Sequence, residues 1–295
     1  ATFPISKFVD RWREAIETAA NQRARSKPSA SATFDPGFPS VRLLLEYCQS
    51  PFTTGQYFEH ALRADNEIVT TGIRIPDDML SEWGFKPPIP SAKAHDMPRE
   101  LRSPLAQTLR NLPNGFAPTA YLWIDSGVAD LAADIEALNV PRICYIIDTH
   151  CAFDTRLEIA RRFNFTFLAQ KTHLPHFVHA GITNVAWMPL ACSPELHDVG
   201  PMERKYDVAF VGAVSDDPND RRKKLLDAVQ ARFPNSFVGR AWPEEMARIY
   251  AQAKIVINIS AMRDINMRVF EGLASGALLI TDPSDGLEEL FKDKE

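Results

Sequence analysis

The sequence predicts an α/β protein made of two doubly wound, Rossmann-like domains that face each other across a cleft. Three observations support this fold class: a length of 295 residues, short apolar runs that alternate with helical patterns, and a polar stretch at 188–205 after which the alternation begins again. Domains usually have about 100–150 residues, so this length suits two of them. Continuous apolar strands separated by helices are typical of parallel sheets covered on both faces.

The first 40 residues, 1–40, are expected to form a helix and a linker. Apolar residues recur at spacings of three and four in the first part, at Phe8, Trp12, Ile16 and Ala19, which is typical of an amphipathic helix. The rest is rich in Ser, Pro and Ala and favours a linker. This segment has no apolar signal-peptide core, and no later run approaches the roughly 20 apolar residues of a membrane span.

The N-terminal domain is expected at 41–190. Its strands are predicted at 41–47, 67–71, 119–124, 142–147, 164–169 and 183–188, and its helices at 127–138 and 153–163. Residues 74–118 contain many prolines and interrupt the alternation, so they are expected to form a long loop with one short helix. Loops of this length are often functional.

The C-terminal domain is expected at 206–295. Its strands are predicted at 206–212, 235–239, 254–260 and 277–281, and its helices at 220–233, 243–253 and 265–275. Ninety residues are few for such a domain, and the chain stops inside a helical pattern. We therefore expect this domain to be incomplete and the natural protein to continue beyond residue 295.

Composition and charge narrow the function. With 45% hydrophobic and 24% charged residues, the chain has the composition of an ordinary globular protein. Its 33 basic and 38 acidic residues give a net charge of −5, so nucleic-acid binding is not expected. The cysteines form no CxxC pair and lie in or beside apolar runs, at Cys48, Cys144, Cys151 and Cys192. Buried free thiols and a cytoplasmic location are expected.

The segment 257–282 carries most of the predicted chemistry. Asp264 is predicted to cap a helix that begins at Ile265, and Gly276 to end that helix before the next strand. The polar residues near the helix start are Asn266, Arg268 and Glu271. Free N–H groups and a partial positive charge make a helix start suitable for phosphate.

Arg268 is expected to neutralise a diphosphate there, and Glu271 to accept hydrogen bonds from a ribose diol. The alternative is that these two residues form a solvated ion pair on a surface helix. Arg222 begins the helix at 220–233 and is a second expected phosphate ligand. The alternative for Arg222 is a solvated basic run.

Asp148 and His150 follow the predicted strand 142–147 and are the candidate catalytic residues. A carboxylate or imidazole at this edge of a sheet is suited to take the proton of an acceptor hydroxyl as general base. The alternative is that Asp148 caps the next helix, and Asp125 is a further candidate base after the neighbouring strand. Gly55 opens a helix on the acceptor side and is expected to let a substrate approach closely.

No metal site is expected. His173, His176 and His179 recur every third residue, but on a helix they spread too widely to converge as three zinc ligands. The sequence has no Walker A loop, no GxGxxG after a strand and no GxSxG elbow.

The pattern R-x-F-E-x-x-A-x-G, followed by an apolar strand and Asp, resembles the donor site of GT-B glycosyltransferases. Within that fold it is most similar to the group-1-like branch that includes the spore-maturation-type, CgeB-like enzymes. YDVAFVG, FVGRAWPEEMARIYAQAKIVINIS and DGLEELF match as well, over roughly 206–291. TTGQYFEHAL, YIIDTH and GITNVAWMPLA fit the acceptor-side domain more weakly.

This resemblance implies roles for residues of this sequence. Glu271 matches the ribose-binding glutamate, Arg268 with Asn266 the pyrophosphate site, and Gly212 the glycine after the first donor-domain strand. Arg240 and Trp242 fall where the base is held, although Trp242 before Pro243 also suits a hydrophobic staple. Many retaining members carry a second glutamate that contacts the donor sugar, and here its position is Arg263.

The function implied is a metal-independent glycosyltransferase of hexosyltransferase type, without a bound cofactor. It would move a sugar from a nucleotide-diphosphate sugar to an unknown acceptor, which is a saccharide, a protein or a small molecule. The alternatives are a catalytically silent protein that binds sugar nucleotides or serves as a scaffold, and a nucleotide-sugar epimerase of the same fold. Arg263 and the short C-terminal domain keep the silent alternative open.

Overall fold

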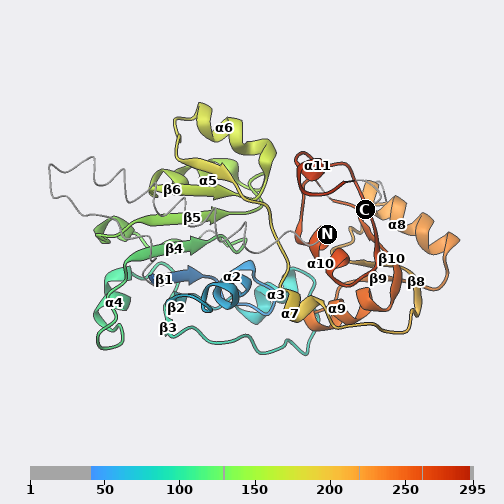
Figure 1. The fold of residues 1–295 in the computed structure, drawn as a ribbon, viewed down its shortest axis with the longest axis horizontal. Helices are drawn as coiled ribbons and strands as arrows, with labels where there is room; N and C mark the ends of the chain where they lie inside the picture. Colours follow the sequence, from blue (N-terminus) through green and yellow to red (C-terminus); the bar gives the residue numbers. More distant parts are fainter. Residues whose placement is uncertain (1–40, 129, 219, 261, 293–295) are drawn as a thin grey trace. The chain divides into compact units, whose positions relative to one another are not determined.

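The computed structural model describes residues 41–128, 130–218, 220–260 and 262–292, so the helix and linker predicted at 1–40 lie outside it. The described residues fall into two compact units (Figure 1). The N-terminal unit holds residues 41–75 and Ser91–Met188, and the C-terminal unit holds Pro76–Pro90 and 189–292. The segment Pro76–Pro90 therefore packs with the later part of the chain, although the sequence places it within the long loop of the N-terminal domain.

A parallel sheet forms the centre of the N-terminal unit. Within the described part of the chain it has seven strands: β1 (Arg42–Tyr47), β2 (Glu67–Gly72), β3 (Met97–Pro98), β4 (Ala120–Ile124), β5 (Arg142–Ile146), β6 (Phe165–Leu168) and β7 (Val185–Trp187). Their order, β3-β2-β1-β4-β5-β6-β7, is doubly wound about β1 and β4. The six predicted strands are confirmed, and β3 was missed because two residues leave no apolar pattern.

The helices of this unit are α2 (Thr54–Leu62), α4 (Leu105–Arg110), η1 (Ile135–Ala137), α5 (Phe153–Arg161), η2 (Lys171–His173) and α6 (Leu174–His179). The helix predicted at 127–138 is wrong, since its described residues contain only η1. Two acidic side chains of this segment instead accept hydrogen bonds from backbone N–H groups at 102–106. The Asp134 carboxylate accepts the N–H groups of Leu105 and Ala106 at 2.7 and 2.9 Å, and the Asp130 carboxylate accepts that of Arg102 at 3.1 Å.

The C-terminal unit has its own parallel sheet, four-stranded within the described ranges, in the order β11-β10-β8-β9. Its strands are β8 (Tyr206–Val211), β9 (Ser236–Gly239), β10 (Ala253–Asn258) and β11 (Leu278–Thr281). Its helices are α3 (Asp77–Glu82), α7 (Pro194–His197), α8 (Arg221–Arg232), α9 (Pro243–Ala251), α10 (Met267–Ala274) and α11 (Leu287–Leu290). The four strands and the three long helices predicted here are confirmed, with ends moved by a few residues. The short helix α7 was missed, whereas α11 lies in the helical pattern predicted at the end of the chain. Two short helices, α3 and α4, lie in 74–118, where the sequence predicted one.

Alternation along β8 explains why helices cover both faces of this sheet. Ala209 and Val211 pack into one apolar cluster with Tyr250 of α9. Phe210 packs into a second cluster on the other face, with Leu226 of α8. Successive side chains of a strand point to opposite faces, so an all-apolar strand needs a helix on each side.

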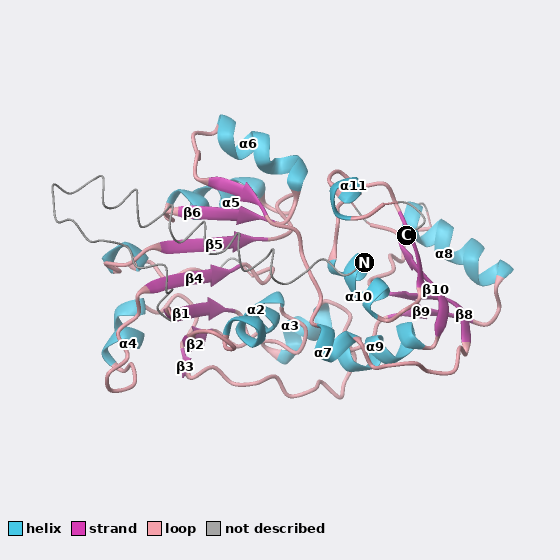
Figure 2. Ribbon diagram, in the orientation of Figure 1, coloured by secondary structure: helices cyan, strands magenta, loops and turns pink. Residues whose placement is uncertain are grey.

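Figure 2 shows the strands β4, β5 and β6 as arrows that point the same way, as the register of the sheet requires.

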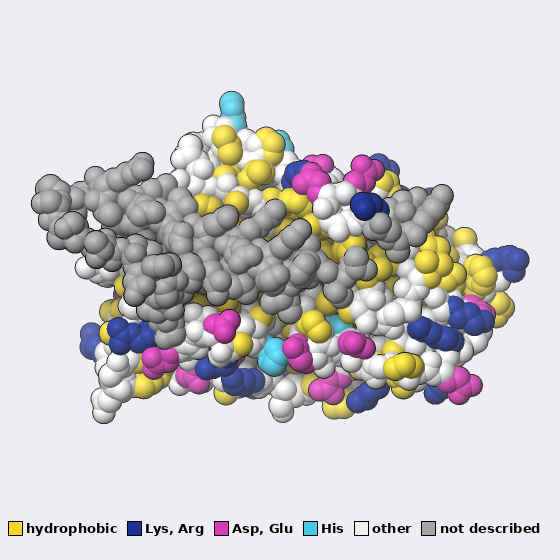
Figure 3. Space-filling model, viewed as in Figure 1, with side chains coloured by type: hydrophobic (Ala, Val, Ile, Leu, Met, Phe, Trp, Pro, Cys, Tyr) yellow, Lys and Arg dark blue, Asp and Glu magenta, His cyan; other side chains and the backbone are white. Residues whose placement is uncertain are grey.

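On the face drawn in Figure 3, acidic and basic side chains of the described residues are interspersed. In the described ranges, no helix combines the length and the apolar composition that crossing a membrane requires.

The space beside Gly55 is occupied by another side chain of the protein. It lies buried in the first turn of α2, and a Cβ added there would collide with the ring of Tyr47 at the end of β1. The Tyr47 hydroxyl donates a 2.5 Å hydrogen bond to Glu59 further along α2, which fixes the ring in place. The small size of Gly55 thus serves helix-to-strand packing, and the expectation that it admits a substrate has no support in this geometry.

We expect Gly55→Ala to lower the free energy of unfolding by about 1–3 kcal/mol, because an added methyl group overpacks a rigid site. Gly239→Ala is the matched control, since a Cβ there would lie 3.7 Å from the Phe237 ring, an ordinary contact. Urea unfolding followed by tryptophan fluorescence measures both variants. Equal stability of the two would contradict the packing role assigned to Gly55.

Candidate functional site

The carboxyl ends of the C-terminal strands frame the candidate site. Ligands of parallel sheets bind beyond these ends, and the residues concerned are Gly212 after β8, Asn258 and Ser260 at the end of β10, and Asp282 after β11. The Asn258 amide donates to Thr281 Oγ1 at 2.9 Å, and the Ser260 N–H donates to Asp282 at 3.1 Å. These bonds fix the edge of the sheet against which α10 begins.

The start of α10 differs from the prediction by two residues. The helix begins at Met267, and Asn266 is its cap, because the Asn266 side chain accepts the Arg268 N–H at 3.1 Å. The capping role predicted for Asp264 is therefore wrong. Asp264 bonds Ser260 instead, through its carboxylate and its N–H. Gly276 ends the region as predicted, with a φ of 70° and an N–H bond to Leu273 of 3.1 Å.

Arg268 is held by uncharged groups. Its Nε donates to the carbonyl of Val211 at 2.7 Å, and its Nη1 donates to Asn258 Oδ1 at 2.6 Å. Its guanidinium lies over the Phe210 ring, 4.7 Å from the centroid. A Cβ on Gly212 would come within 2.6 Å of Arg268 Nη2, so a larger residue there would displace the guanidinium from its present position. The sequence singled out both residues, and the structure brings them together.

Arg222 lies against the same ring. Asp220 caps α8 by accepting the Lys223 N–H at 2.8 Å, which directs the first turn of α8 toward the end of β8. The Arg222 guanidinium then lies 5.7 Å from the Phe210 centroid and donates to the carbonyl of Ala213 at 2.9 Å. Burial, together with the charge of Arg268, lowers the pKa of Arg222. Two guanidinium groups therefore share one aromatic ring.

Neither of these two arginines forms an ion pair within the described ranges, and Arg222 Nε is a buried donor without a hydrogen-bond partner there. The neighbouring Arg221 differs, because Asp282 accepts from both of its terminal nitrogens at 2.8 and 3.1 Å. The Arg222–Arg268 pair, which we call the arginine pair, thus concentrates positive charge beside the start of α10. Such a charge, next to the positive end of a helix dipole, attracts an anion.

Glu271 lies one turn into α10 and is only 6% exposed. Burial raises the pKa of Glu271 to about 7, although the nearby charge of Arg268 works in the opposite direction. The solvated ion pair considered as an alternative for Arg268 and Glu271 does not form among the described residues. The Glu271 carboxylate instead has His197 beside it, with Nε2 and Oε1 3.6 Å apart.

Arg240 and Trp242 follow β9 and line a pocket of about 500 Å³ within the C-terminal unit, together with Gly84, Phe85, Lys86, Pro87, Pro88, Ala241 and Glu245. The Trp242 ring stacks on Phe85 with centroids 4.7 Å apart, and Arg240 lies 4.9 Å from the Phe85 centroid. Burial lowers the pKa of Arg240. The Trp242 ring therefore packs on Phe85, a residue far back in the sequence. The hydrophobic staple considered as its alternative role is a contact within α9 and stays a prediction.

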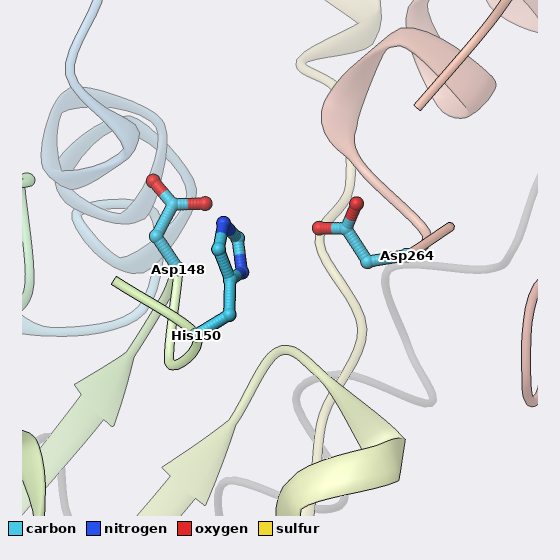
Figure 4. A group of neighbouring side chains, drawn as sticks. All are labelled: Asp148, His150 and Asp264. Atoms are coloured by element: carbon cyan, nitrogen blue, oxygen red, sulfur yellow. The ribbon is translucent and has the colours of Figure 1, made fainter. Parts of the chain in front are cut away.

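In the N-terminal unit, Asp148 and His150 project from the loop after β5 (Figure 4). The capping role considered for Asp148 is wrong, because Ala152 occupies the N-cap position of α5 and no side chain caps that helix. Asp264, which Figure 4 also labels, belongs to the C-terminal unit and was described above.

Asp125, the further candidate base, forms a buried ion pair. Its carboxylate accepts from Arg156 Nε at 2.8 Å and from the Gly127 N–H at 3.0 Å. Burial raises the pKa of Asp125 to about 6, against the lowering effect of Arg156, while the charge of Asp148 raises it further. The pair ties the loop after β4 to α5, which is a structural role.

The four cysteines are free, as expected, but only Cys48 and Cys144 are buried, and Cys151 is exposed. The rings of His173 and His176 pack near Phe153, with centroids 6.1 and 6.2 Å from it. These histidines therefore lie on an aromatic surface of the N-terminal unit.

Two residues of the site escaped the sequence analysis. His197 lies in the linker that the sequence assigns to neither domain, and the only signal for it was a histidine in a short Pro-led helical turn. Phe85 comes from the proline-rich segment, and nothing in its neighbourhood indicates that it packs against β9 and α9. Both become visible only once the chain has folded.

The raised pKa of Glu271 predicts a pH dependence of stability. The folded pKa lies above the usual value of 4.5, so the fold favours the protonated form, and this contribution is lost as pH rises toward about 7. We expect Glu271→Gln to become more stable relative to wild type between pH 4.5 and pH 7.5, by up to about 3 kcal/mol. Denaturant titrations at both pH values, with exposed Glu288→Gln as control, check this. A constant difference between wild type and Glu271→Gln would contradict the burial argument.

Known proteins resemble this chain in sequence over its C-terminal part and in structure over most of its length. Residues 209–295 match a family model described as glycosyl transferase-like. A comparison with curated proteins finds no match. Similar solved structures are distant in sequence. Anabaena Alr3699/HepE in complex with UDP and glucose has a TM-score of 0.53 and 12% identity, over 85% of this chain and 83% of that one. The same Anabaena protein in complex with UDP gives 0.51 and 12%, over 85% and 82%. Sucrose-phosphate synthase from Thermosynechococcus elongatus gives 0.49 and 11%, over 84% and 82%.

At such low sequence identities the structural similarity indicates the fold alone. The match to the family model concerns residues 209–295. Parallel sheets, helices on both faces of the sheets and the two compact units agree with the fold class predicted from the sequence. The chain is therefore an α/β protein of GT-B fold whose residues 209–295 match a glycosyltransferase-like family.

Proposed function

We propose that this protein is a metal-independent glycosyltransferase that uses a nucleoside-diphosphate sugar, with the C-terminal unit as its donor-binding part. The arginine pair is the observation that carries this proposal. Both guanidinium groups lie on Phe210, and their hydrogen bonds go to the uncharged oxygens of Val211, Asn258 and Ala213. Their charge is thus available to an anionic ligand.

The comparisons support the class of donor. The glycosyl transferase-like match covers β8 to the end of the described chain, which contains the arginine pair, Glu271 and Trp242. The solved Anabaena structures of similar fold are complexes with UDP, one of them with glucose as well. We therefore propose UDP as the leaving group and a UDP-hexose as the donor.

The reaction needs one bond exchange. The bond between the anomeric carbon and the diphosphate oxygen breaks, a bond from that carbon to an acceptor oxygen forms, and the hydroxyl proton passes to a base. The arginine pair and the positive end of the α10 dipole would stabilise the charge that develops on the diphosphate. Asp148 and His150 are the groups proposed to receive the proton. The acceptor is a saccharide, a protein or a small molecule with a free hydroxyl.

Other residues of the C-terminal unit are proposed to contact the ribose, the base and the diphosphate of the donor. Glu271 would accept the ribose hydroxyls, and the pocket lined by Arg240 and Trp242 has a volume suited to a base. Gly212 would allow the diphosphate to approach the end of β8. The alternative of a catalytically silent binding protein rests on Arg263, which replaces the second glutamate of many retaining enzymes and has a φ of 56°. Binding of UDP without turnover of UDP-hexoses, in a panel of hydroxyl acceptors, would favour that alternative.

We expect Arg222→Gln to weaken UDP binding by about 10- to 100-fold, the range for losing a charge-assisted hydrogen bond. Arg221→Gln is the matched control, because Arg221 precedes it in the same helix turn but pairs with Asp282. Isothermal titration calorimetry measures both. The assignment fails if the two variants lose affinity equally or if neither does.

Chelation gives a separate expectation for turnover. The charge that a divalent cation would supply is already present in the arginine pair, so transfer from UDP-hexose is expected to keep most of its rate in excess EDTA. The measurement is release of UDP with and without chelator. Loss of turnover that Mg²⁺ or Mn²⁺ restores would reject metal independence while leaving the transferase proposal intact.

A further inference from the structure

His197 connects the linker to the site through Glu271. It is the last residue of α7 and is completely buried. Its Nε2 lies 3.6 Å from Glu271 Oε1, which is longer than a hydrogen bond but close enough for each group to respond to the charge of the other. The helices α7, α9 and α10 pack on one another around this pair.

The other ring nitrogen of His197 faces two backbone groups of opposite character. Nδ1 lies 2.8 Å from the carbonyl oxygen of Ser193 and 3.2 Å from its N–H. A carbonyl oxygen only accepts and an N–H only donates, so Ser193 offers a partner to Nδ1 whether or not Nδ1 carries the proton. Neither neutral tautomer of His197 is therefore penalised by a lost hydrogen bond at this end.

The tautomers differ at the Glu271 end. With the proton on Nδ1, Nε2 presents a lone pair, which suits a protonated Glu271 carboxyl. With the proton on Nε2, the ring presents a donor, which suits an ionised Glu271. Burial lowers the pKa of His197, so the ring remains neutral and the choice between tautomers replaces a change of charge.

Other charged and titratable groups also face Glu271. Burial raises the pKa of Glu271, and the positive charge of Arg268 on α10 opposes that rise. Burial raises the pKa of Cys192, before α7, to about 11. Burial also raises the pKa of Tyr250 on α9, where the charge of Glu271 adds to the effect. Among the described residues, the pair of Glu271 and His197 is thus the part of this site that exchanges a proton near pH 7.

We propose that His197 is a positioning residue for Glu271, which moves its ring proton from Nδ1 to Nε2 when Glu271 ionises and so couples the binding of a nucleoside 2′,3′-diol to the release of one proton. This inference rests on the proposed function. The Glu271 carboxyl proton passes to Nε2, the Nδ1 proton leaves to solvent, and the Ser193 N–H then donates to Nδ1. The ionised carboxylate, held by the Nε2–H group, accepts the two hydroxyls.

The coupling predicts how affinity depends on pH. A diol binds the ionised carboxylate, so UDP affinity rises with pH up to about 7, by as much as tenfold per pH unit, and is level above it. UDP that lacks both ribose hydroxyls has the same phosphates but no diol, so the ratio of the two affinities isolates Glu271. Calorimetry from pH 5.5 to 8.5 measures this ratio. Buffers of different ionisation enthalpy at pH 6.5 report the released proton.

Two variants separate positioning from packing. His197→Phe keeps a ring but cannot donate to the carboxylate, so we expect the midpoint of the ratio to rise by at least one pH unit and the UDP affinity at pH 7 to fall about tenfold. His197→Gln keeps a side-chain donor, and its midpoint should stay within about half a unit of wild type. Exposed His179→Phe is the matched control and should behave as wild type.

A second readout needs no nucleotide. The ¹⁵N shifts of the His197 ring distinguish its tautomers, and we expect the ring to change from Nδ1–H to Nε2–H as pH passes about 7. A fixed tautomer, or a ratio in His197→Phe that matches wild type, overturns the inference even when UDP binds well. Absence of UDP binding at every pH would instead reject the proposed function, while the tautomer change would still decide the proton exchange.

Discussion

The contacts of Arg268 join the carboxyl ends of two strands of the C-terminal unit to the first turn of α10. One guanidinium joins the carbonyl of Val211 at the end of β8, the amide of Asn258 at the end of β10 and the first turn of α10. A side chain at position 212 would displace the same guanidinium, because a Cβ there would come within 2.6 Å of Arg268 Nη2. The first turn of α10, the end of β8 and the position of the positive charge are thus consequences of one side chain.

Holding an arginine by neutral oxygens has an electrostatic consequence. A carboxylate partner would fix the side chain equally well but would cancel its charge for any ligand. The Val211 carbonyl and the Asn258 amide fix it without doing so, and Phe210 adds a cation–π contact to both members of the arginine pair. Charges that are placed in advance need little rearrangement when a ligand arrives, which is how fixed groups stabilise developing charge most effectively. The cost lies in the mutual repulsion of Arg222 and Arg268, which helps to lower the pKa of Arg222.

The strands and the frame of the site were predictable because both depend on local pattern. β1, β4 and β8 are largely apolar runs, and most of their residues are buried in the folded protein. Asp, Asn and Gly at helix ends indicate where α8 and α10 begin and where α10 ends. The cap of α10 was placed two residues too early because Asp264 and Asn266 are both good capping residues, and only the bonds of Asp264 to Ser260 decide between them. The helix predicted at 127–138 failed for a related reason. The Asp134 carboxylate accepts the backbone N–H groups of Leu105 and Ala106. The Asp130 carboxylate accepts that of Arg102 and pairs with Arg99, and no local pattern reveals these distant partners.

The pocket beside β9 shows how a distant segment can set the chemistry of a site that local sequence describes only in part. Arg240 and Trp242 follow β9, where the nucleotide base was expected. Phe85 belongs to the distant segment Pro76–Pro90, and its ring stacks on one face of the Trp242 ring. The Arg240 guanidinium lies over the Phe85 ring. A planar ligand therefore cannot use that face of Trp242 unless Phe85 leaves it. The rest of the pocket wall combines apolar residues such as Pro87 and Pro88 with the charged residues Lys86 and Glu245. A base in this pocket would meet an aromatic surface that is already paired, so its contacts would come from the edges of the Phe85–Trp242 stack and from polar groups of the wall. Selectivity of that kind depends on where hydrogen-bond donors and acceptors lie around the ring of the ligand, since stacking alone accepts every base.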